Sequence, residues 1–270
     1  MISFIIPAHN EELELAATLD AIHAAASHAA QPYEIIVIDD ASTDATAEIG
    51  SRAGAKVIRI NRRQIAAARN GGARAAQGEY LVFVDADTRI NRIHVTQALA
   101  ALEAGYAGGS ARVALDGSIP IWGSLLLHAF GTLYFGLNLG AGAFLFTTRR
   151  NFDAIGGFDE QYFAGEEVYF SLALRKLGRF KVLPEPVVTS GRKLRMYPAK
   201  QFLRNFFGVI IGGPRGVRSR AKLRLWYDGK RETAACERRR VAKPRLGCLV
   251  AKTGSSSKIS ASPWQRATRR

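Results

Sequence analysis

Within the first 115 residues, short apolar runs alternate with longer stretches whose apolar residues recur at helical spacing. This alternation restricts the fold more than any other feature. The runs are rich in Ile and Val and end at turn residues, which predicts strands. Predicted strands lie at 2–6, 34–39, 56–60, 80–85 and 108–115, and predicted helices lie at 11–29, 45–53, 65–76 and 93–103. Apolar strands that alternate with helices indicate βαβ units and an α/β fold with a mainly parallel central sheet.

The uncharged stretch at 117–148 is the part of the chain that comes closest to a membrane span. It is long enough to cross a bilayer, but six glycines, a proline, a histidine and an asparagine interrupt it. We therefore expect a short helix at 121–136 followed by a strand at about 141–147. A helix at 166–177 and a strand at 180–183 come next.

Composition divides the chain near residue 229, where apolar periodicity ends and Arg, Lys and Ser take over. We expect one domain over 1–228, with a first half at 1–115 and a second half at 116–228. The basic tail at 229–270 has too little apolar surface to bury and is expected to be disordered.

The net charge of +15 is unevenly distributed. Residues 1–148 carry a net −4, residues 149–228 a net +9 and residues 229–270 a net +10. A nucleic-acid-binding protein that is basic throughout does not divide in this way, and no RNA-binding signature appears, so no specific nucleic acid is expected. The asymmetry instead predicts an anionic partner for the second half.

Between residues 192 and 226, basic side chains alternate with Phe and Ile. This mixture is typical of a segment that lies on an anionic membrane surface, and a helix folded on the domain with a solvated basic face is the alternative. Residues 1–7 have no basic stretch before their apolar run, so no signal peptide is expected. The predicted location is the cytoplasm, including the cytoplasmic face of the membrane.

Carboxylates collect where the predicted strands end. Asp39 and Asp40 end the second strand, Asp85 and Asp87 follow the fourth, and Glu11 follows the first. Ligands of an open parallel sheet bind beyond the carboxyl ends of its strands, so these side chains are expected at one edge. Because crowded carboxylates repel one another, the cluster predicts a bound cation or a ligand rich in hydroxyl groups.

The segment Asp85-Ala86-Asp87 gives the sharpest chemical signal. Residues i and i+2 of an extended segment point to the same side, so both carboxylates can address one divalent ion. Oxygen ligands suit Mg²⁺ or Mn²⁺, and such sites commonly combine one or two carboxylates with substrate phosphates. A solvated turn with an Asp cap is the alternative.

Two other groups have both a functional and a structural interpretation. Asp39 and Asp40 can accept hydrogen bonds from a ribose or a base, or can form a turn and helix cap. Arginines near the third helix can bind a diphosphate, although at least half are expected to be surface residues. These side chains, together with a neighbouring amide, are Arg62, Arg63, Arg69 and Asn70.

Glu166 and Glu167 stand at the start of a predicted helix. Acidic residues in a first helical turn complement the helix dipole, and one of them can instead act as a general base. The spacing alone leaves both interpretations open.

Four ordered motifs resemble the family 2 glycosyltransferases, inverting enzymes with the GT-A fold, a Rossmann-like nucleotide-diphospho-sugar transferase fold. The matching stretches are SFIIPAHNEE, VIDDASTDAT, AAARNGGARAAQGEYLVFVDADT and GAFLFTTRRNFDAIGGFDEQYFAGEEVYFSLALRKLG. Together they cover about residues 1–190. Their order is more specific than any single motif.

The resemblance implies that a sugar passes from a nucleotide-diphosphate sugar to an acceptor hydroxyl, with inversion. It implies that the half at 1–115 binds the nucleotide sugar and that the half at 116–228 binds the acceptor. It places Asp85 and Asp87 in a DxD motif that holds Mn²⁺ or Mg²⁺, with Asp87 as the direct ligand. Asp40 is the expected contact to the base or ribose. The residues implied to line the nucleotide-sugar site are Pro7, Glu11, Asp39, Asp40, Arg69, Asp85 and Ala86.

The acidic pair of the family is usually Glu-Asp, and here it is Glu166-Glu167. Glu167 stands at the position of the catalytic base, with the assignment between the two glutamates left open. No QxxRW motif follows, which argues against a processive polysaccharide synthase, and no histidine follows His128 to add a metal ligand. The expected acceptor is a glycan or a lipid-linked molecule of cell-envelope biosynthesis.

Two alternatives remain from the sequence. A non-catalytic nucleotide-binding module would use the same strand ends without turnover. A sugar-nucleotide pyrophosphorylase would share a related sheet but carries a Gly-rich loop after its first strand, where this chain has Ala8-His9-Asn10-Glu11.

Overall fold

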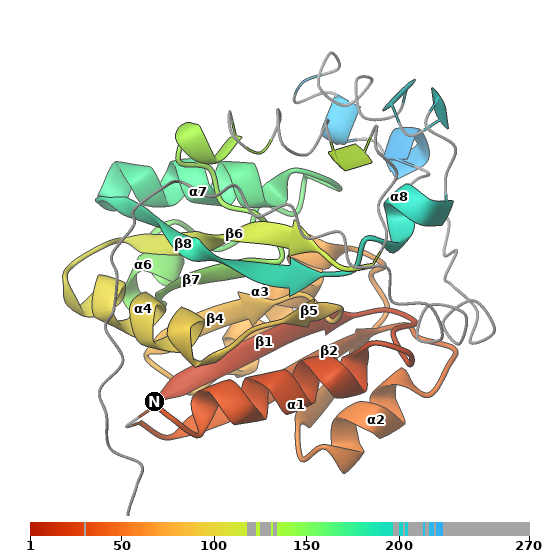
Figure 1. Cartoon of the computed structure of the whole chain (residues 1–270), viewed down its shortest axis with the longest axis horizontal. Coiled ribbons are helices and arrows are strands. Elements are labelled where there is room, and N and C mark those ends of the chain that lie inside the picture. Colours follow the sequence, from red (N-terminus) through yellow and green to blue (C-terminus); the bar gives the residue numbers. More distant parts are fainter. Residues whose placement is uncertain are drawn as a thin grey trace, which may run out of the picture.

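A computed structural model describes residues 1–29, 31–117, 134–196 and the separate positions 123–124, 131, 200–201, 203–204, 213, 216–218 and 220–223. Most of the helix expected at 121–136 lies outside the described residues. The same holds for the aromatic residues of the segment 192–226 and for the tail 229–270. The strong β propensity of the apolar runs is realised in one sheet (Figure 1).

Within the described residues the sheet has eight strands. Their order across the sheet is β3 (Lys56–Ile60), β2 (Tyr33–Asp40), β1 (Ile2–Ala8), β4 (Tyr80–Val84), β7 (Phe144–Thr148), β6 (Gly108–Leu115), β8 (Phe180–Thr189) and β5 (Thr88–Arg89). The neighbours from β3 to β4 pair in parallel, as do β6 and β8. β7 is antiparallel to both β4 and β6, and β5 is antiparallel to β8. The predicted mainly parallel α/β sheet is confirmed.

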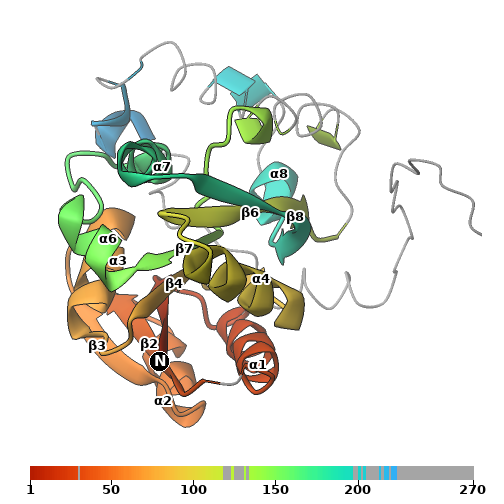
Figure 2. The same ribbon diagram turned by 90° about the vertical axis from the view of Figure 1, so that its left-hand side faces the viewer.

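Helices cover both faces of this sheet, as Figure 2 shows. They are α1 (Leu15–Ala26), α2 (Thr46–Arg52), α3 (Ile65–Ala75), α4 (Arg92–Glu103), α6 (Arg149–Ala154) and α7 (Glu166–Leu177). A short helix α8 (Arg192–Met196) follows β8, and a 3₁₀ turn η1 (Arg220–Leu223) comes later. α1 and α4 lie against one face, and α3, α6 and α7 lie against the other.

Successive residues of the central strands supply the two cores. In β1, Phe4 and Ile6 join α1 and α4 in one core, while Ile5 packs with α3 on the other side. β4 divides in the same way, with Val82 on the first face and Phe83 on the second. Because side chains alternate along a strand, a continuous apolar run serves two helical layers at once. This is why the runs in the sequence do not alternate with polar residues.

Three short elements, β5, α6 and α8, were not expected from the sequence, because each is too short to show a period. The strand expected at 180–183 continues to Thr189 through Pro184 and Pro186. These prolines are tolerated because β5 pairs with β8 only at Val188 and Thr189, so the outer edge of β8 is unpaired beside them. The helix expected from residue 11 begins at Leu15.

Gly72 determines how closely α3 approaches the sheet. A Cβ atom there would lie 2.3 Å from Cγ2 of Ile5 and 3.2 Å from Cγ1 of Ile38. The neighbouring Gly71 has only the terminal nitrogen of Arg74 within reach, at 3.8 Å. The close contact keeps the side chains of α3 aligned with the ends of β1 and β4.

We therefore expect Gly72→Ala to destabilise the protein by about 1–3 kcal/mol, the usual effect of overpacking a core. Gly71→Ala on the same helix is the matched control, and it should be neutral or stabilising by about 0.5–1 kcal/mol because alanine favours the helix. Urea unfolding of the two variants measures both effects. Equal stability of the two would contradict the close packing of α3 on β1.

Candidate active site

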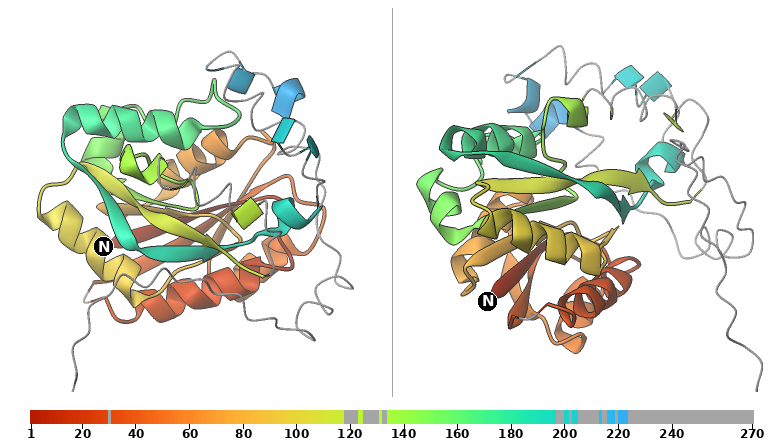
Figure 3. Two further views of the ribbon diagram at one scale, coloured as in Figure 1. Left: turned by 45° about the horizontal axis from the view of Figure 1, so that its top comes forward. Right: turned by 60° about the vertical axis from the view of Figure 1, so that its left-hand side comes forward.

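The acidic residues that end or follow β1, β2 and β4 stand at the carboxyl ends of parallel strands, and thus at one edge of the sheet. The short helix α8 follows the end of β8 at this edge (Figure 3). β8 runs in the same direction as β6 and β4, so its carboxyl end opens at this edge as well. The short helix α8 therefore begins beside the segment that follows β4. One contact fixes this arrangement, since the Thr189 hydroxyl donates to Oδ1 of Asp87 at 3.1 Å.

Arg69 of α3 links the end of β4 to the start of α7. Its side chain is 1% exposed. Nη1 donates to Oε1 of Glu166 at 2.6 Å, and Nη2 donates to Oδ1 of Asp85 at 2.8 Å and to the carbonyl of Gly142 at 2.9 Å. The guanidinium also lies over the ring of Phe158, 5.3 Å from its centre. Arg69 was expected to face a diphosphate, and in this structure it is a buried bridge between two carboxylates.

Burial raises the pKa values of two acidic groups around this bridge, and Arg69 opposes the rise. Burial raises the pKa of Asp85 to about 6, against the lowering effect of Arg69, and the charge of Asp87 adds to the rise. Burial, and then the charge of Glu166, raises the pKa of Glu167 to about 8, while Arg69 opposes the shift. Glu167 is half-buried and close to Glu166, so it holds its proton more tightly than an ordinary glutamate does.

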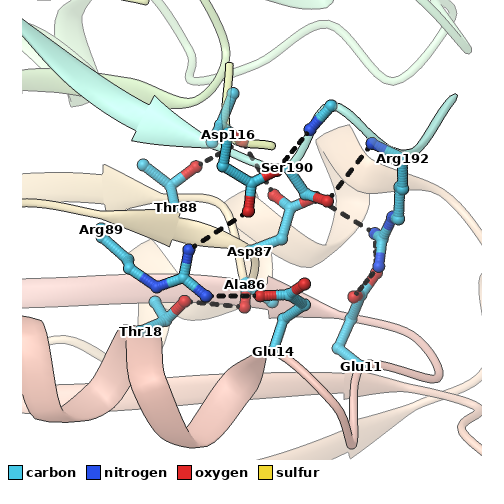
Figure 4. A network of polar contacts seen from close by, with 12 residues as sticks. Glu11, Glu14, Thr18, Ala86, Asp87, Thr88, Arg89, Asp116, Ser190 and Arg192 are labelled. Carbon is cyan, nitrogen blue, oxygen red and sulfur yellow. Dashed lines mark hydrogen bonds and ion pairs between the residues drawn. The ribbon is translucent and has the colours of Figure 1, made fainter. Parts of the chain in front are cut away.

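Arg192 of α8 forms the second cationic centre of the site (Figure 4). Nη1 and Nη2 donate to the two carboxylate oxygens of Glu11 at 2.7 and 2.6 Å, and Nη2 lies 3.2 Å from Oδ2 of Asp87. Burial alone would lower the pKa of Arg192, but the hydrogen bonds that it donates to Glu11 and the charge of Asp87 raise the pKa above the ordinary value. Sequence analysis had placed Arg192 on a basic surface segment, and the structure corrects this, because the side chain is 12% exposed and faces inward.

A second layer of polar contacts supports this arrangement (Figure 4). Arg89 of β5 donates to Glu14 at 2.7 Å and lies 3.5 Å from Asp116. Asp116 also accepts from the backbone N–H of Gly191 at 3.0 Å and lies 3.4 Å from Nη1 of Arg195. Arg195 therefore also faces inward, which corrects its expected place on the basic surface.

Glu14, Arg89 and Asp116 were not among the residues expected at the site. Asp116 directly follows the strand predicted at 108–115, so the same strand-end argument that found Asp85 would have found it. No local pattern marks Glu14 or Arg89, because each depends on β5, an element of two residues.

Asp40 and Asp39 of β2 differ in what their carboxylates do. Asp40 accepts three backbone hydrogen bonds at 2.7 Å, two at Oδ1 from Arg62 and Arg63 and one at Oδ2 from Gln64. Asp39 accepts from the backbone N–H of Ser42 at Oδ1, and its Oδ2 lies 3.7 Å from Nε of the exposed Arg59. Asp40 therefore shapes the loop before α3, and Asp39 keeps more accepting capacity for a ligand.

Three further residues of the expected nucleotide site, Pro7, Ala86 and Glu11, are held in place by strand pairing or by hydrogen bonds. Pro7 pairs with Ile38 inside the strands, and Ala86 is buried with its carbonyl accepting from the Thr18 hydroxyl at 2.9 Å. Glu11 is fixed by Arg192 and by its own N–H, which donates to the Thr46 hydroxyl at 2.8 Å.

The residues of the site fit a divalent cation held partly by substrate. Asp85 and Asp87 are 28% and 17% exposed and offer carboxylate oxygens, the donor type that Mg²⁺ and Mn²⁺ favour. No group of three or more potential ligands gathers among the residues that the structure describes. Magnesium sites built on one or two carboxylates and completed by phosphate oxygens do not require one.

Comparisons with known proteins identify the family of the chain. A family model described as Glycosyl transferase family 2 matches residues 3–154. An undecaprenyl-phosphate 4-deoxy-4-formamido-L-arabinose transferase of Aeromonas hydrophila is 32% identical over 114 residues, covering 39% of this chain and 35% of that protein. A 4,4'-diaponeurosporenoate glycosyltransferase of Staphylococcus haemolyticus is 36% identical over 105 residues, covering 36% of this chain and 27% of that protein. The match thus spans about a third of the length of these curated relatives.

Solved structures support the fold. S. aureus TarS 1–349 in complex with UDP-GlcNAc superposes with a TM-score of 0.57 at 20% identity, over 78% of this chain and 66% of that one. The mannosyltransferase PcManGT of Pyrobaculum calidifontis, in complex with GDP-Man and Mn²⁺, gives 0.56 at 19% identity, over 91% and 76%. At these identities the likeness concerns the fold alone, and the expected GT-A type fold is confirmed. In the described part of the chain, no helix combines the length and apolarity that a bilayer crossing requires.

The raised pKa of Glu167 predicts a specific dependence of stability on pH. An acid whose pKa is higher in the folded state stabilises that state below its unfolded pKa, and this stabilisation is lost as pH rises through the folded pKa. For Glu167 the window runs from 4.5 to about 8. The wild type should therefore lose stability relative to Glu167→Gln as pH rises through this window. Urea unfolding of both proteins at several pH values measures the difference, and a difference that does not change with pH would refute the shift.

Removing the guanidinium of Arg69 should be strongly destabilising, because the buried Glu166 and the partly buried Asp85 would be left without their counter-ion. We expect Arg69→Met to lower the free energy of unfolding by about 3–5 kcal/mol. The exposed Arg74 on the same helix gives the control, and Arg74→Met should stay within about 0.5 kcal/mol of wild type. Urea unfolding near neutral pH compares the two. An Arg69→Met protein as stable as the control would exclude the bridge.

Proposed function

The chain belongs to glycosyl transferase family 2, and on that premise we propose that it is an inverting, metal-dependent glycosyltransferase. In this proposal it moves a sugar from a nucleotide-diphosphate sugar to an acceptor hydroxyl. The observation that carries the proposal is the Arg69 bridge. One buried guanidinium holds Asp85, on the side expected for the donor, and Glu166, next to a glutamate with a raised pKa.

On the donor side, the acidic strand ends match the groups that a nucleotide diphosphate sugar presents. Asp39 has accepting capacity for a ribose hydroxyl or a base N–H, and Asp40 supports the loop beside it. Asp39 therefore replaces Asp40 as our first choice for that contact. Asp87 and Asp85 would hold Mn²⁺ or Mg²⁺, which neutralises charge on the diphosphate leaving group when it is bound.

On the acceptor side, Glu167 is proposed as the general base. A carboxylate with a pKa near the working pH takes up a proton readily as the acceptor oxygen attacks. Glu167 accepts the proton of the acceptor hydroxyl, the oxygen bonds to the anomeric carbon, and the bond to the diphosphate breaks on the opposite face. Glu166, held by Arg69, positions this helix end and raises the proton affinity of its neighbour. This arrangement favours Glu167 over Glu166 as the base.

For the acceptor, we propose a lipid-linked molecule or a cell-envelope glycan. Support comes from the names of the relatives. They include an undecaprenyl-phosphate 4-deoxy-4-formamido-L-arabinose transferase and a 4,4'-diaponeurosporenoate glycosyltransferase. An amylovoran biosynthesis glycosyltransferase of Erwinia amylovora is 29% identical over 127 residues. Such acceptors fit a cytoplasmic enzyme that works at the anionic face of a membrane. With Arg192 and Arg195 turned inward, the surface for that contact would come from the later basic residues of the segment 192–226.

The test is nucleotide release from a panel of UDP-, GDP- and dTDP-sugars, with and without Mn²⁺. We expect one donor to be cleaved in a Mn²⁺-dependent way, and Glu167→Gln to lower kcat about 10²–10⁴-fold, the usual contribution of a positioned base. Nucleotide binding by this variant should be unchanged, since Gln keeps the shape of the side chain. Glu103→Gln, at the exposed end of α4, is the control and should retain full activity.

The alternatives give different products in the same assay. A nucleotide-binding module would bind UDP or GDP without turnover in either protein. A pyrophosphorylase would form a sugar 1-phosphate in the presence of pyrophosphate and release no nucleoside diphosphate. Full turnover by Glu167→Gln would overturn the base assignment alone.

A further inference from the structure

Arg192 occupies the space between Glu11 and Asp87 at the acidic edge. Its side chain comes from α8, far along the chain from both carboxylates, and it is the cation in direct contact with Asp87 in the part of the chain that the structure describes. The proposed function places the donor diphosphate and its metal ion at this carboxylate. Arg192 is therefore in the path of the donor, although the residues so far assigned to donor binding do not include it.

The charges explain why a cation stands there. Glu11 and Asp87 are 8% and 17% exposed, and two carboxylates held this close without a counter-ion would repel one another. Arg192 supplies the counter-ion in the chain without its ligand. Once a divalent ion binds Asp87, the same carboxylate no longer needs the guanidinium, and two cations would compete for one oxygen.

The guanidinium also has donors to spare. Arginine carries five N–H donors in a planar fork, and the two hydrogen bonds to Glu11 use two of them, while the contact to Asp87 is an ion pair at 3.2 Å. An arginine that keeps its two bonds to Glu11 can thus direct further N–H groups at a phosphate oxygen. Bidentate recognition of phosphate is the chemistry for which arginine is best suited.

The base of α8 is anchored independently of these carboxylates. Asp116 accepts from the N–H of Gly191, and Nη1 of Arg195 donates to the Asp116 carbonyl at 2.9 Å. Arg192 can therefore change its partners while the helix that carries it stays in place.

From this geometry we infer that Arg192 is a donor-binding residue that exchanges Asp87 for the diphosphate of the donor. In the ligand-free protein its guanidinium neutralises Glu11 and Asp87. When a divalent ion binds Asp87, the guanidinium leaves that carboxylate, keeps Glu11 and hydrogen-bonds the diphosphate. The inference rests on the proposed function, because it needs a nucleotide diphosphate and a metal ion at this edge.

Two binding measurements on the full chain test the inference, with Mn²⁺, UDP and GDP as probes. The first is Mn²⁺ affinity without nucleotide, followed by the electron paramagnetic resonance of free Mn²⁺. The second is nucleotide affinity at saturating Mn²⁺, followed by calorimetry. Arg192→Gln should bind Mn²⁺ about tenfold more tightly than wild type, because a competing cation is gone. It should bind the preferred nucleotide about tenfold more weakly, because a charge-assisted hydrogen bond is lost.

Arg74→Gln is the control, since it removes the same charge from the exposed surface of α3 and leaves the anchor of α8 intact. Both of its affinities should stay within about twofold of wild type, far less than a tenfold step. Arg192→Lys keeps the charge but loses the planar guanidinium. Its Mn²⁺ affinity should therefore equal that of wild type, and its nucleotide affinity should lie between those of wild type and Arg192→Gln. Circular dichroism melting confirms that each variant is folded.

The outcomes separate the two hypotheses. If wild type and Arg192→Gln bind Mn²⁺ and nucleotide equally well, Arg192 is a structural ion pair and the inference is wrong, while the proposed function stands. A folded wild type that binds neither Mn²⁺ nor either nucleotide overturns the proposed function and the inference together. Opposite shifts of the two affinities in Arg192→Gln alone support the exchange.

Discussion

The buried guanidinium of Arg69 is the interaction on which the arrangement of the site depends. It connects three parts of the chain that pack on different elements, namely α3, the segment after β4 and the start of α7. A single charge balances Asp85 and Glu166, and it opposes the rise that burial causes in the pKa of Asp85. The same charge also opposes the rise in the pKa of Glu167 that burial and Glu166 cause. The close approach of α3 at Gly72 places this arginine where it can reach both partners.

A second arginine, Arg192, neutralises the carboxylates in the other half of the acidic edge, and its side chain is less enclosed than that of Arg69. Arg69 is enclosed, with its donors directed at Asp85, Glu166 and a carbonyl. Arg192 lies nearer to solvent on a helix of five residues that is anchored by its own contacts. One cation thus belongs to the folded core, while the other stands where a ligand can compete with it. This division lets an acidic edge be stable without a ligand and still bind one.

The sheet could be predicted from the sequence because each central strand is a continuous run of apolar residues between turn signals. Short runs of this kind form few structures other than buried strands. The sequence also placed Asp85, Asp87 and Asp39 at one edge, since strand ends of a parallel sheet converge. The partners of Arg69 and Arg192 could not be predicted from the sequence. Arg69 and Glu166 are 97 residues apart and Arg192 and Glu11 are 181 apart, and no local period marks either pair. Pairing at such separations is decided by topology, and topology also decides the two-residue strand β5 and the extension of β8 past its prolines.

The three backbone hydrogen bonds of Asp40 have a consequence for how this loop can evolve. They end at the N–H groups of residues 62 to 64, so the shape of the loop does not depend on which side chains Arg62 and Arg63 carry. Arg63 has a φ of 50°, which makes a β-branched residue costly there, but most other replacements keep the anchor. Sequence drift at these two positions can change the side chains that the loop carries while its backbone stays anchored to β2. Divergence of the loop surface is in this way separated from the risk of unfolding.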